Sequence, residues 1–248
     1  MEAREIYLFS RVEKDHFFYR ARREMVRHWL GLLFAGQEHK PLVIDTGAGT
    51  GIFLQEMDNS FEALGCDLFF EPGISLPETR LARANACCLP FPDGAADAAV
   101  ALDLLEHLED DDSGLRELGR ITRPGGYVFI NVPAFPLLWS DWDQAVGHKR
   151  RYKKEMLRTV ALAAGLEIVF IRYVNSLPFF PILLYRWLRS GFGIGKAQRL
   201  EDRLPPKWLN RILLRAFFLQ GTRAWINIPF GVSLFAVLRK KSGNKQHI

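Results

Sequence analysis

The 248-residue chain is poor in cysteine and lacks long uncharged apolar runs. Its three cysteines, Cys66, Cys87 and Cys88, form no Cys-x-x-Cys pair, so neither a disulfide framework nor a zinc site is indicated. No apolar run reaches the roughly 20 residues that a membrane-spanning helix requires. The first ten residues mix acidic and basic side chains, unlike a secretory signal. We therefore expect a cytoplasmic protein with reduced thiols and no metal site.

Acidic residues are scarce in the C-terminal part of the chain. Over the whole sequence 33 Lys and Arg stand against 28 Asp and Glu, and 48% of residues are hydrophobic. Residues 177–248 hold 13 basic and only 2 acidic side chains, whereas residues 1–176 are net acidic. A chain of this length and composition can bury one α/β core. The charge asymmetry indicates an anionic surface or partner for the C-terminal end.

Short apolar strands alternate with helical patterns up to Val174. Strands are predicted over residues 41–44, 61–66, 81–86, 98–102, 127–132 and 166–174, and helices over 12–34, from 52 onward, over about 109–122 and over 154–164. Such alternation is typical of a parallel sheet covered by helices. After Val174 the pattern changes to proline-interrupted apolar stretches, with a helical segment over 208–225. A last strand is predicted over 232–238.

The strongest chemical signal is a glycine loop that follows the first strand. In Asp45-Thr46-Gly47-Ala48-Gly49-Thr50-Gly51 the spacing is Gly-x-Gly-x-Gly after an acid, and not the Gly-x-Gly-x-x-Gly that cradles a pyrophosphate. The acid would repel a pyrophosphate but can bind an ammonium group. Asp67, which ends the second strand, is placed to accept hydrogen bonds from ribose hydroxyls. A ligand with a ribose, a cationic amine and no phosphate is S-adenosylmethionine.

Four ordered segments make the chain resemble a class I S-adenosylmethionine-dependent methyltransferase of the type 11-like group. They are residues 43–51, Gly65-Cys66-Asp67, Leu89-Pro90-Phe91-Pro92-Asp93-Gly94, and Leu104-Leu105-Glu106-His107-Leu108 with the later Arg123-Pro124-Gly125-Gly126. The resemblance implies an α/β fold with a Rossmann-like seven-stranded sheet. That sheet would be mostly parallel with an antiparallel last strand, with helices on both faces and a basic, apolar helical insertion before the last strand.

The same resemblance implies a single domain over residues 1–248. Its parts would be an N-terminal lid helix in 12–40, a cofactor-binding core in 41–174, the insertion in 175–228 and the last strand in 229–241. Tyr19 and Arg22 of the lid helix would touch the cofactor, with plain packing as the alternative. No oligomeric state is predicted.

The resemblance also assigns residues to S-adenosylmethionine and its product S-adenosylhomocysteine. The loop residues Asp45, Thr46, Gly47, Ala48, Gly49 and Gly51 would hold the methionyl part, Asp67 and Leu68 the ribose, and Asn85 and Ala86 the adenine, with Asp103 nearby. The family usually has aspartate at the position of Asn85, but an amide oxygen can still accept a hydrogen bond from the adenine amino group.

The acceptor is predicted beside the loop after the fifth strand, because ligands of an open parallel sheet bind beyond the carboxyl ends of its strands. Residues 147–152 are similar to the Gly-His-x-Arg-Arg-Tyr segment of a methyltransferase subgroup. His148 could act as a general base for a hydroxyl group, with Asp143 orienting it. The alternative is that His148 only holds the loop to the next helix. His107 is a second catalytic candidate, with a structural role near the cofactor as its alternative.

We expect methyl transfer to an oxygen of a small-molecule or lipid-linked acceptor. The alternative is a methyltransferase-like scaffold or partner subunit that binds the cofactor without turning it over. Nucleic-acid bases are disfavoured as acceptors because no Asn-Pro-Pro-Tyr or Pro-Cys segment follows the fourth strand. The insertion either lies on an anionic membrane surface, which would make the protein peripheral to the membrane, or packs as a lid or dimer face. RNA contact is a third interpretation.

Overall fold

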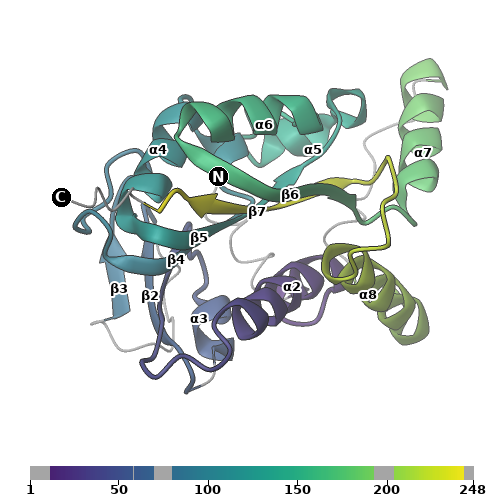
Figure 1. Ribbon diagram of the computed structural model, residues 1–248. Coiled ribbons are helices and arrows are strands. Elements are labelled where there is room, and N and C mark those ends of the chain that lie inside the picture. Colours follow the sequence, from purple (N-terminus) through teal and green to yellow (C-terminus); the bar gives the residue numbers. More distant parts are fainter. Residues whose placement is uncertain (1–11, 58, 70–79, 193–203, 243–248) are drawn as a thin grey trace. The chain divides into compact units, whose positions relative to one another are not determined.

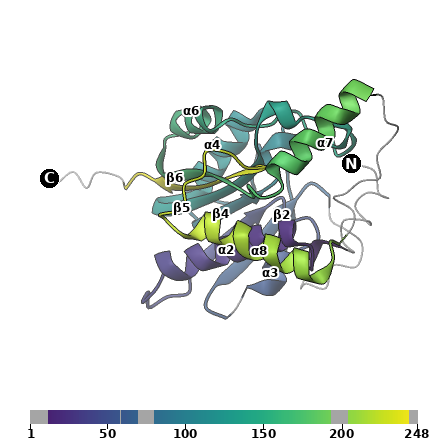
Figure 2. The ribbon, with the colours of Figure 1, turned by 90° about the vertical axis from the view of Figure 1, so that its right-hand side faces the viewer.

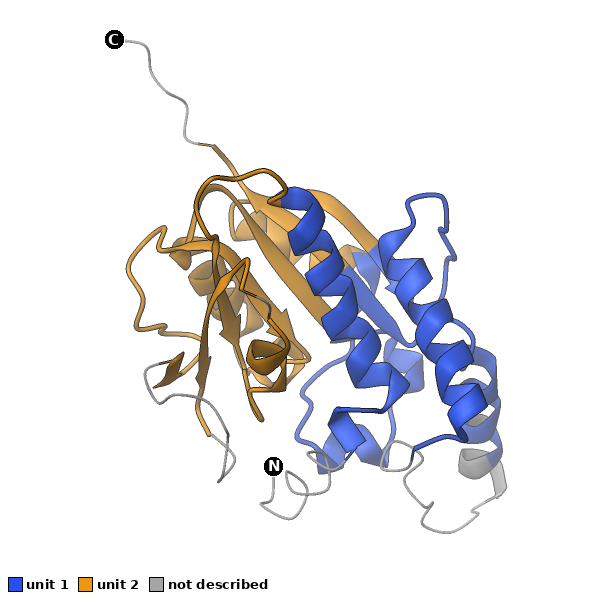
Figure 3. Cartoon of the chain, turned by 90° about the horizontal axis from the view of Figure 1, so that it is seen from below, with its two compact units in different colours: residues 1–33, 132–154, 172–235 blue, residues 34–131, 155–171, 236–248 orange. Residues whose placement is uncertain are grey.

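The computed structural model describes residues 12–57, 59–69, 80–192 and 204–242 (Figure 1). Residues 193–203 of the predicted insertion therefore lie outside the described residues. The chain divides into two compact units, coloured separately in Figure 3. Unit 1 comprises residues 1–33, 132–154 and 172–235, and unit 2 comprises residues 34–131, 155–171 and 236–248. A single domain over the whole chain stays a prediction.

Seven strands form a sheet in the order β3-β2-β1-β4-β5-β7-β6. They are β1 (Leu42–Thr46), β2 (Glu62–Asp67), β3 (Leu81–Arg83), β4 (Ala96–Leu102), β5 (Thr122–Pro133), β6 (Leu166–Val174) and β7 (Ser233–Lys240). β1 pairs in parallel with β2 and β4, β2 with β3, and β4 with β5. The last strands are antiparallel, so the predicted Rossmann-like mixed sheet is confirmed.

Unit 2 holds the helical elements α3 (Ile52–Glu56), η2 (Leu105–His107), α4 (Asp111–Ile121) and most of α6 (Lys154–Ala163). The helix predicted over about 109–122 is observed as α4, and Asp110 is its N-cap. Its carboxylate accepts hydrogen bonds from the backbone N–H and the hydroxyl of Ser113, at 2.9 and 2.7 Å. The carboxylates of the first turn also suit the positive end of the helix.

β5 begins earlier than the predicted strand over 127–132. Thr122 already pairs with Ala96, so Pro124, Gly125 and Gly126 lie inside the strand. Glycine at position 126 permits this pairing because the backbones of β5 and β4 lie close together there. A Cβ on Gly126 would lie 2.6 Å from the carbonyl oxygen of Asp97 in β4. Only glycine fits beside the neighbouring strand at this register.

β3 is shorter than the predicted strand over 81–86. After Arg83 the chain turns, since the Oδ1 atom of Asn85 accepts a hydrogen bond from the N–H of Cys87 at 2.9 Å, and the N–H of Cys88 donates to the carbonyl of Asn85. The amide side chain of Asn85 thus closes its own turn, which ends the strand.

Unit 1 holds α2 (Phe17–Leu33), η3 (Pro136–Leu138), α5 (Asp141–Ala145), α7 (Phe179–Phe192) and α8 (Lys207–Thr222). α2 starts five residues later than the predicted helix, and α8 ends three residues earlier. α2 and α8 pack together (Figures 1 and 2). The indole N–H of Trp29 donates to the carbonyl of Gly221 at 2.9 Å, and the N–H of Phe17 donates to the Oδ1 atom of Asn210 at 2.8 Å. The N-terminal helix is therefore paired with the second helix of the insertion.

Whether a helix can cross a membrane depends on its length and on how apolar it is. In the part of the chain that the structure describes, no helix combines the length and apolar character needed to cross a bilayer.

Candidate cofactor site and acceptor loop

Three glycines with left-handed backbone form the loop between β1 and α3 in unit 2. The φ angles of Gly47, Gly49 and Gly51 are 80°, 49° and 70°, a region that other residues rarely adopt. The N–H groups of Gly47 and Ala48 both donate to the carbonyl of Cys66, at 2.8 and 3.1 Å. The loop is thereby attached to the end of β2, and a Cβ on Gly49 would meet nothing closer than a backbone oxygen at 4.0 Å. A ligand can approach the backbone there.

Asp67, at the carboxyl end of β2, supports this loop directly. Its carboxylate accepts hydrogen bonds from the N–H groups of Gly49, at 2.8 Å, and Phe69, at 3.0 Å. Burial raises the pKa of Asp67 above its ordinary value, and the hydrogen bonds from these N–H groups oppose that shift. Two carboxylate oxygens offer more acceptor positions than these two bonds use, which leaves capacity for ribose hydroxyls. Leu68 beside it is exposed.

Gly65 lies under the glycine loop and is a residue whose role the sequence did not reveal. A Cβ there would lie 2.6 Å from Leu54 of α3 and 2.9 Å from the Cβ of Ala48. The buried side chains of Asp45 and Thr46 end β1 next to this packed region, with 4% and 1% of their surface exposed. The signal available in the sequence was a glycine inside a strand two residues before Asp67.

Asp103 follows β4 and has the left-handed φ of 53°, which is strained for a residue other than glycine. Asn131 of β5 fixes it: its Nδ2 atom donates to the carboxylate at 2.6 Å, and the N–H of Asp103 donates to the carbonyl of Asn131 at 2.8 Å. Asn131 is fully buried. It is a positioning residue that the sequence analysis missed, because its partner is set by strand register.

The predicted adenine residues are also in unit 2. Asn85 is exposed and Ala86 half-buried. Because the amide oxygen of Asn85 already accepts a hydrogen bond from Cys87, its side chain points back to its own turn. Its second lone pair and its two N–H groups are the atoms that could meet a base.

Asp143 is the centre of a polar cluster in the loop after β5, inside unit 1. Its carboxylate is fully buried and accepts hydrogen bonds from the backbone N–H and hydroxyl of Ser140, from the Nδ1 atom of His148 at 2.9 Å and from the Nε atom of Arg151 at 2.7 Å. Arg151 also donates to the carbonyl of Ala134. The cluster ties helix α5 to the chain on either side of it.

The charge state of this cluster follows from its contacts. Burial raises the pKa of Asp143, but the hydrogen bond from His148 and the charge and hydrogen bond of Arg151 outweigh it and lower the pKa to about 2. The carboxylate is therefore ionised at neutral pH and accepts a hydrogen bond from the Nδ1–H of the imidazole. In the neutral ring the lone pair is then on the Nε2 atom, which is the atom able to accept a proton.

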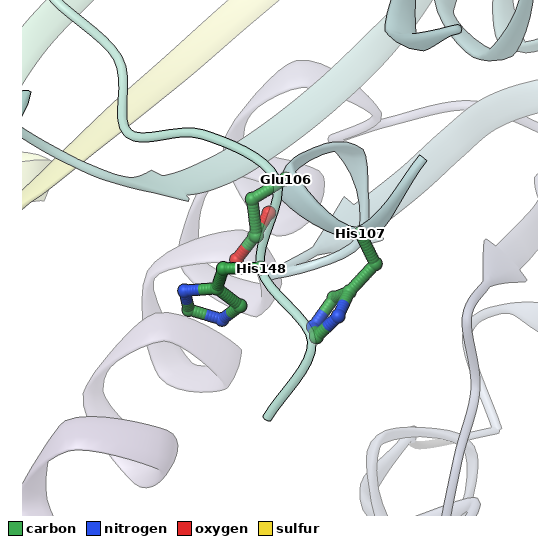
Figure 4. A group of neighbouring side chains, drawn as sticks. All are labelled: Glu106, His107 and His148. Carbon is green, nitrogen blue, oxygen red and sulfur yellow. The ribbon is translucent and has the colours of Figure 1, made fainter. Parts of the chain in front are cut away.

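His107, the other catalytic candidate, belongs to η2 in unit 2 and is half-buried, and Glu106 before it is fully buried. Figure 4 labels these two side chains together with His148 of unit 1. Because η2 follows β4 directly, Glu106 and His107 lie at the carboxyl end of that strand. This is the end at which ligands of open α/β sheets bind.

Tyr19 and Arg22 are buried in α2 of unit 1. The guanidinium of Arg22 lies 4.9 Å from the ring centre of Tyr19 and 5.5 Å from that of Phe18, so each ring face meets a cation. These contacts fit the packing alternative, and contact with a cofactor stays a prediction.

A mixed seven-stranded sheet, with a glycine loop after β1 and an acid at the end of β2, is the Rossmann-like fold of class I S-adenosylmethionine-dependent methyltransferases. A family model described as a methyltransferase domain matches residues 18–170. The chain belongs to this methyltransferase-domain family. The predicted family is thereby confirmed, and its dependence on S-adenosylmethionine agrees with the predicted enzyme type and cofactor.

Named relatives match parts of the chain. The "Probable tRNA methyltransferase 9B" of Mus musculus is 32% identical over 129 residues, which is 49% of this chain and 26% of that protein. The "Demethylmenaquinone methyltransferase" of Thermus thermophilus is 32% identical over 122 residues, which is 42% of this chain and 55% of the other. The match thus spans about a quarter of the first relative and about half of the second.

Solved structures share the fold over nearly the whole chain. Phosphoethanolamine N-methyltransferase 2 of Haemonchus contortus, in complex with S-adenosyl-L-methionine, gives a TM-score of 0.60 at 16% identity, over 97% of this chain and 57% of that one. A SAM-dependent methyltransferase from Archaeoglobus fulgidus gives 0.57 at 20% identity, over 94% of this chain and 100% of that one. At these identities the likeness shows the fold alone.

Proposed function

We propose that the chain transfers the methyl group of S-adenosylmethionine to an oxygen of a small-molecule or lipid-linked acceptor. The observation that carries the choice of oxygen is the contact between the ionised, buried Asp143 and the Nδ1 atom of His148. A hydroxyl acceptor must lose a proton as its oxygen is methylated, and an imidazole held in one tautomer is suited to take it. A lipid-linked acceptor would bring with it peripheral attachment to a membrane, whereas a small-molecule acceptor would not require it.

The residues of unit 2 fit the cofactor. The left-handed glycines leave the loop backbone accessible to the methionyl part, and Asp45 would bind its ammonium group. Asp67 would accept from the ribose hydroxyls while it holds the N–H of Gly49. The nucleoside would be contacted by Leu68, Asn85 and Ala86. Asp103, which is held by a hydrogen bond from Asn131, would lie beside the cofactor.

The chemical step needs little from the protein beyond alignment and one proton acceptor. The bound cofactor supplies a methyl group on a positively charged sulfur, which is reactive towards an oxygen aligned with the sulfur–carbon bond. As the acceptor oxygen is methylated, the Nε2 atom of His148 would take the hydroxyl proton. Asp143 stabilises the resulting imidazolium, and S-adenosylhomocysteine is released.

The test uses isotopic methyl transfer to extracts of the source cells. The protein, with S-adenosylmethionine carrying a ¹³C-methyl group, is incubated with lipid and small-molecule fractions, and the product carbon is located by nuclear magnetic resonance. The proposal expects a methoxy signal and a rate that falls about 100-fold or more in His148→Gln. A methyl group on carbon or nitrogen would contradict oxygen transfer.

The same assay separates the alternatives. S-adenosylhomocysteine binding with no transfer to any fraction would favour a cofactor-binding scaffold. Transfer to an added transfer RNA, the substrate class in the name of one relative, would replace the lipid-linked acceptor.

A further inference from the structure

The first helix of the insertion, α7, exposes a row of apolar side chains. Phe180, Leu184 and Leu188 recur every four residues along one face, and 59%, 56% and 36% of their surfaces are exposed. Leu177, just before the helix, is 52% exposed. Phe179 is buried in an aromatic cluster instead. α7 thus has one face packed within unit 1 and one apolar face that stays largely exposed, although the ring of Phe180 also contacts the ring of Phe230, with 4.9 Å between their centres.

The second helix, α8, combines exposed apolar residues with cations. It packs on α2 through Phe217 and Gly221, both buried. Its exposed residues are Lys207, Trp208, Arg211, Ile212, Arg215 and Leu219, and Trp225 beyond its end is 81% exposed. The sequence from residue 204 to the end contains no acidic residue. The exposed side of α8 therefore carries positive charge and large apolar side chains together.

An anionic lipid surface is the partner that matches the exposed side chains of both helices. Its headgroups attract Lys and Arg, its boundary region accommodates tryptophan, and its acyl chains remove aliphatic side chains from water. The phosphates of an RNA would form ion pairs with Arg211 and Arg215, and its bases could stack on Trp208. An RNA would make few favourable contacts with the apolar row on α7, because the exposed positions 180, 184 and 188 carry no charge.

We propose that the exposed faces of α7 and α8 dock this protein on an anionic membrane. Phe180, Leu184 and Trp208 insert at the headgroup boundary, and Arg211 and Arg215 contact the headgroups. The inference deepens the proposed function, because it names the surface at which a lipid-linked acceptor would be met. Docking itself does not require methyl transfer, so the two proposals can fail separately.

Vesicle flotation tests the charge component. The full chain is mixed with vesicles of phosphatidylcholine alone or with a third of phosphatidylglycerol, at low and high salt. We expect binding to the anionic vesicles that weakens in salt. Arg211→Gln with Arg215→Gln should weaken it by about fivefold per charge, the factor that corresponds to about 1 kcal/mol. A matched double variant, Lys40→Gln with Arg158→Gln, removes two exposed charges from unit 2 and should bind nearly as wild type.

A second pair of variants tests the apolar component. Phe180→Ser with Leu184→Ser should reduce vesicle binding about tenfold or more even at low salt, and Trp208→Ala should remove part of the blue shift of tryptophan fluorescence on binding. All replaced residues are exposed, so circular dichroism should stay unchanged. S-adenosylhomocysteine affinity, measured on each variant, reports separately on the cofactor site.

The outcomes against the proposal are specific. Absence of wild-type binding, equal binding to neutral vesicles, or variants that bind as wild type would overturn it. A loss of transfer-RNA binding in the arginine variant with unchanged vesicle binding would assign the face to RNA and would equally overturn it.

Discussion

The Nδ1 atom of His148 lies 2.9 Å from a carboxylate oxygen of Asp143, and the same oxygen accepts a hydrogen bond from Arg151 at 2.7 Å. Both partners favour the ionised carboxylate, which is why its pKa is held at about 2 although the group is fully buried. The arrangement gives the loop after β5 a stabilising role that is independent of any catalytic one. The free energy of unfolding reports on the stabilising role, and the rate of methyl transfer reports on the catalytic role.

Asp143→Asn is expected to destabilise the protein by about 2 kcal/mol at neutral pH, because a pKa of about 2 in the folded chain compares with 3.8 ordinarily. A lowered pKa means that this contribution is complete above about pH 4 and is lost as the pH falls towards 2. Urea unfolding between pH 2 and 7 should show a flatter pH dependence in the variant. Asp141→Asn, at an exposed acid of the same helix, is the control, and equal pH slopes for Asp143→Asn and wild type would refute the prediction.

Gly65→Ala should lower both stability and cofactor affinity. The added methyl would press on Leu54 and Ala48, at 2.6 and 2.9 Å, and such overpacking costs about 1 to 3 kcal/mol. Because Ala48 belongs to the glycine loop, its displacement should also weaken S-adenosylhomocysteine binding. Gly31→Ala is the matched control: it lies in α2 with nothing within 4 Å of its added methyl, and it should stabilise by about 0.5 to 1 kcal/mol. Similar melting temperatures for the two variants would contradict this packing.

The motifs that the sequence could predict are those formed by neighbouring residues. The glycine loop, the N-cap of α4 and the pairing of Asp143 with His148 each involve residues no more than seven apart, so local patterns contain them. The clamp of Asn131 on Asp103 depends instead on the register of β5 against β4. The pairing of α2 with α8 joins residues 192 apart, such as Trp29 and Gly221, and no local pattern specifies it.

The α2–α8 contact provides a third prediction. A methyl group on Gly221 would overlap the buried side chain of Met25, so Gly221→Ala should destabilise by about 1 to 3 kcal/mol. Met25→Ala should destabilise by about 2 to 5 kcal/mol because it leaves a cavity. In the double variant the new methyl occupies part of that cavity, so the combined loss should be smaller than the sum of the single losses. Strict additivity in chemical unfolding would show that the two residues do not touch.

The three cysteines should differ in reactivity. Burial raises the pKa of the Cys66 thiol to about 12, whereas Cys88 is exposed. Since the thiolate is the reactive form, a thiol reagent at pH 8 should modify Cys88 first and leave Cys66 intact until the protein unfolds. Mass spectrometry of digested protein at increasing times checks this order. Fast labelling of Cys66 in the folded protein would contradict the packing of β2 beneath the glycine loop.

Calorimetric titration with S-adenosylhomocysteine tests the central claim most directly, that the loop of Gly47, Gly49 and Gly51 with Asp67 is the cofactor site. Wild type should bind one molecule per chain. Gly49→Arg, which fills the accessible loop and strains a φ of 49°, should abolish binding, and Asp67→Ala should weaken it by about 10-fold to 100-fold, with Gly31→Ala unchanged. No binding by wild type, or wild-type affinity in Gly49→Arg, would contradict the claim.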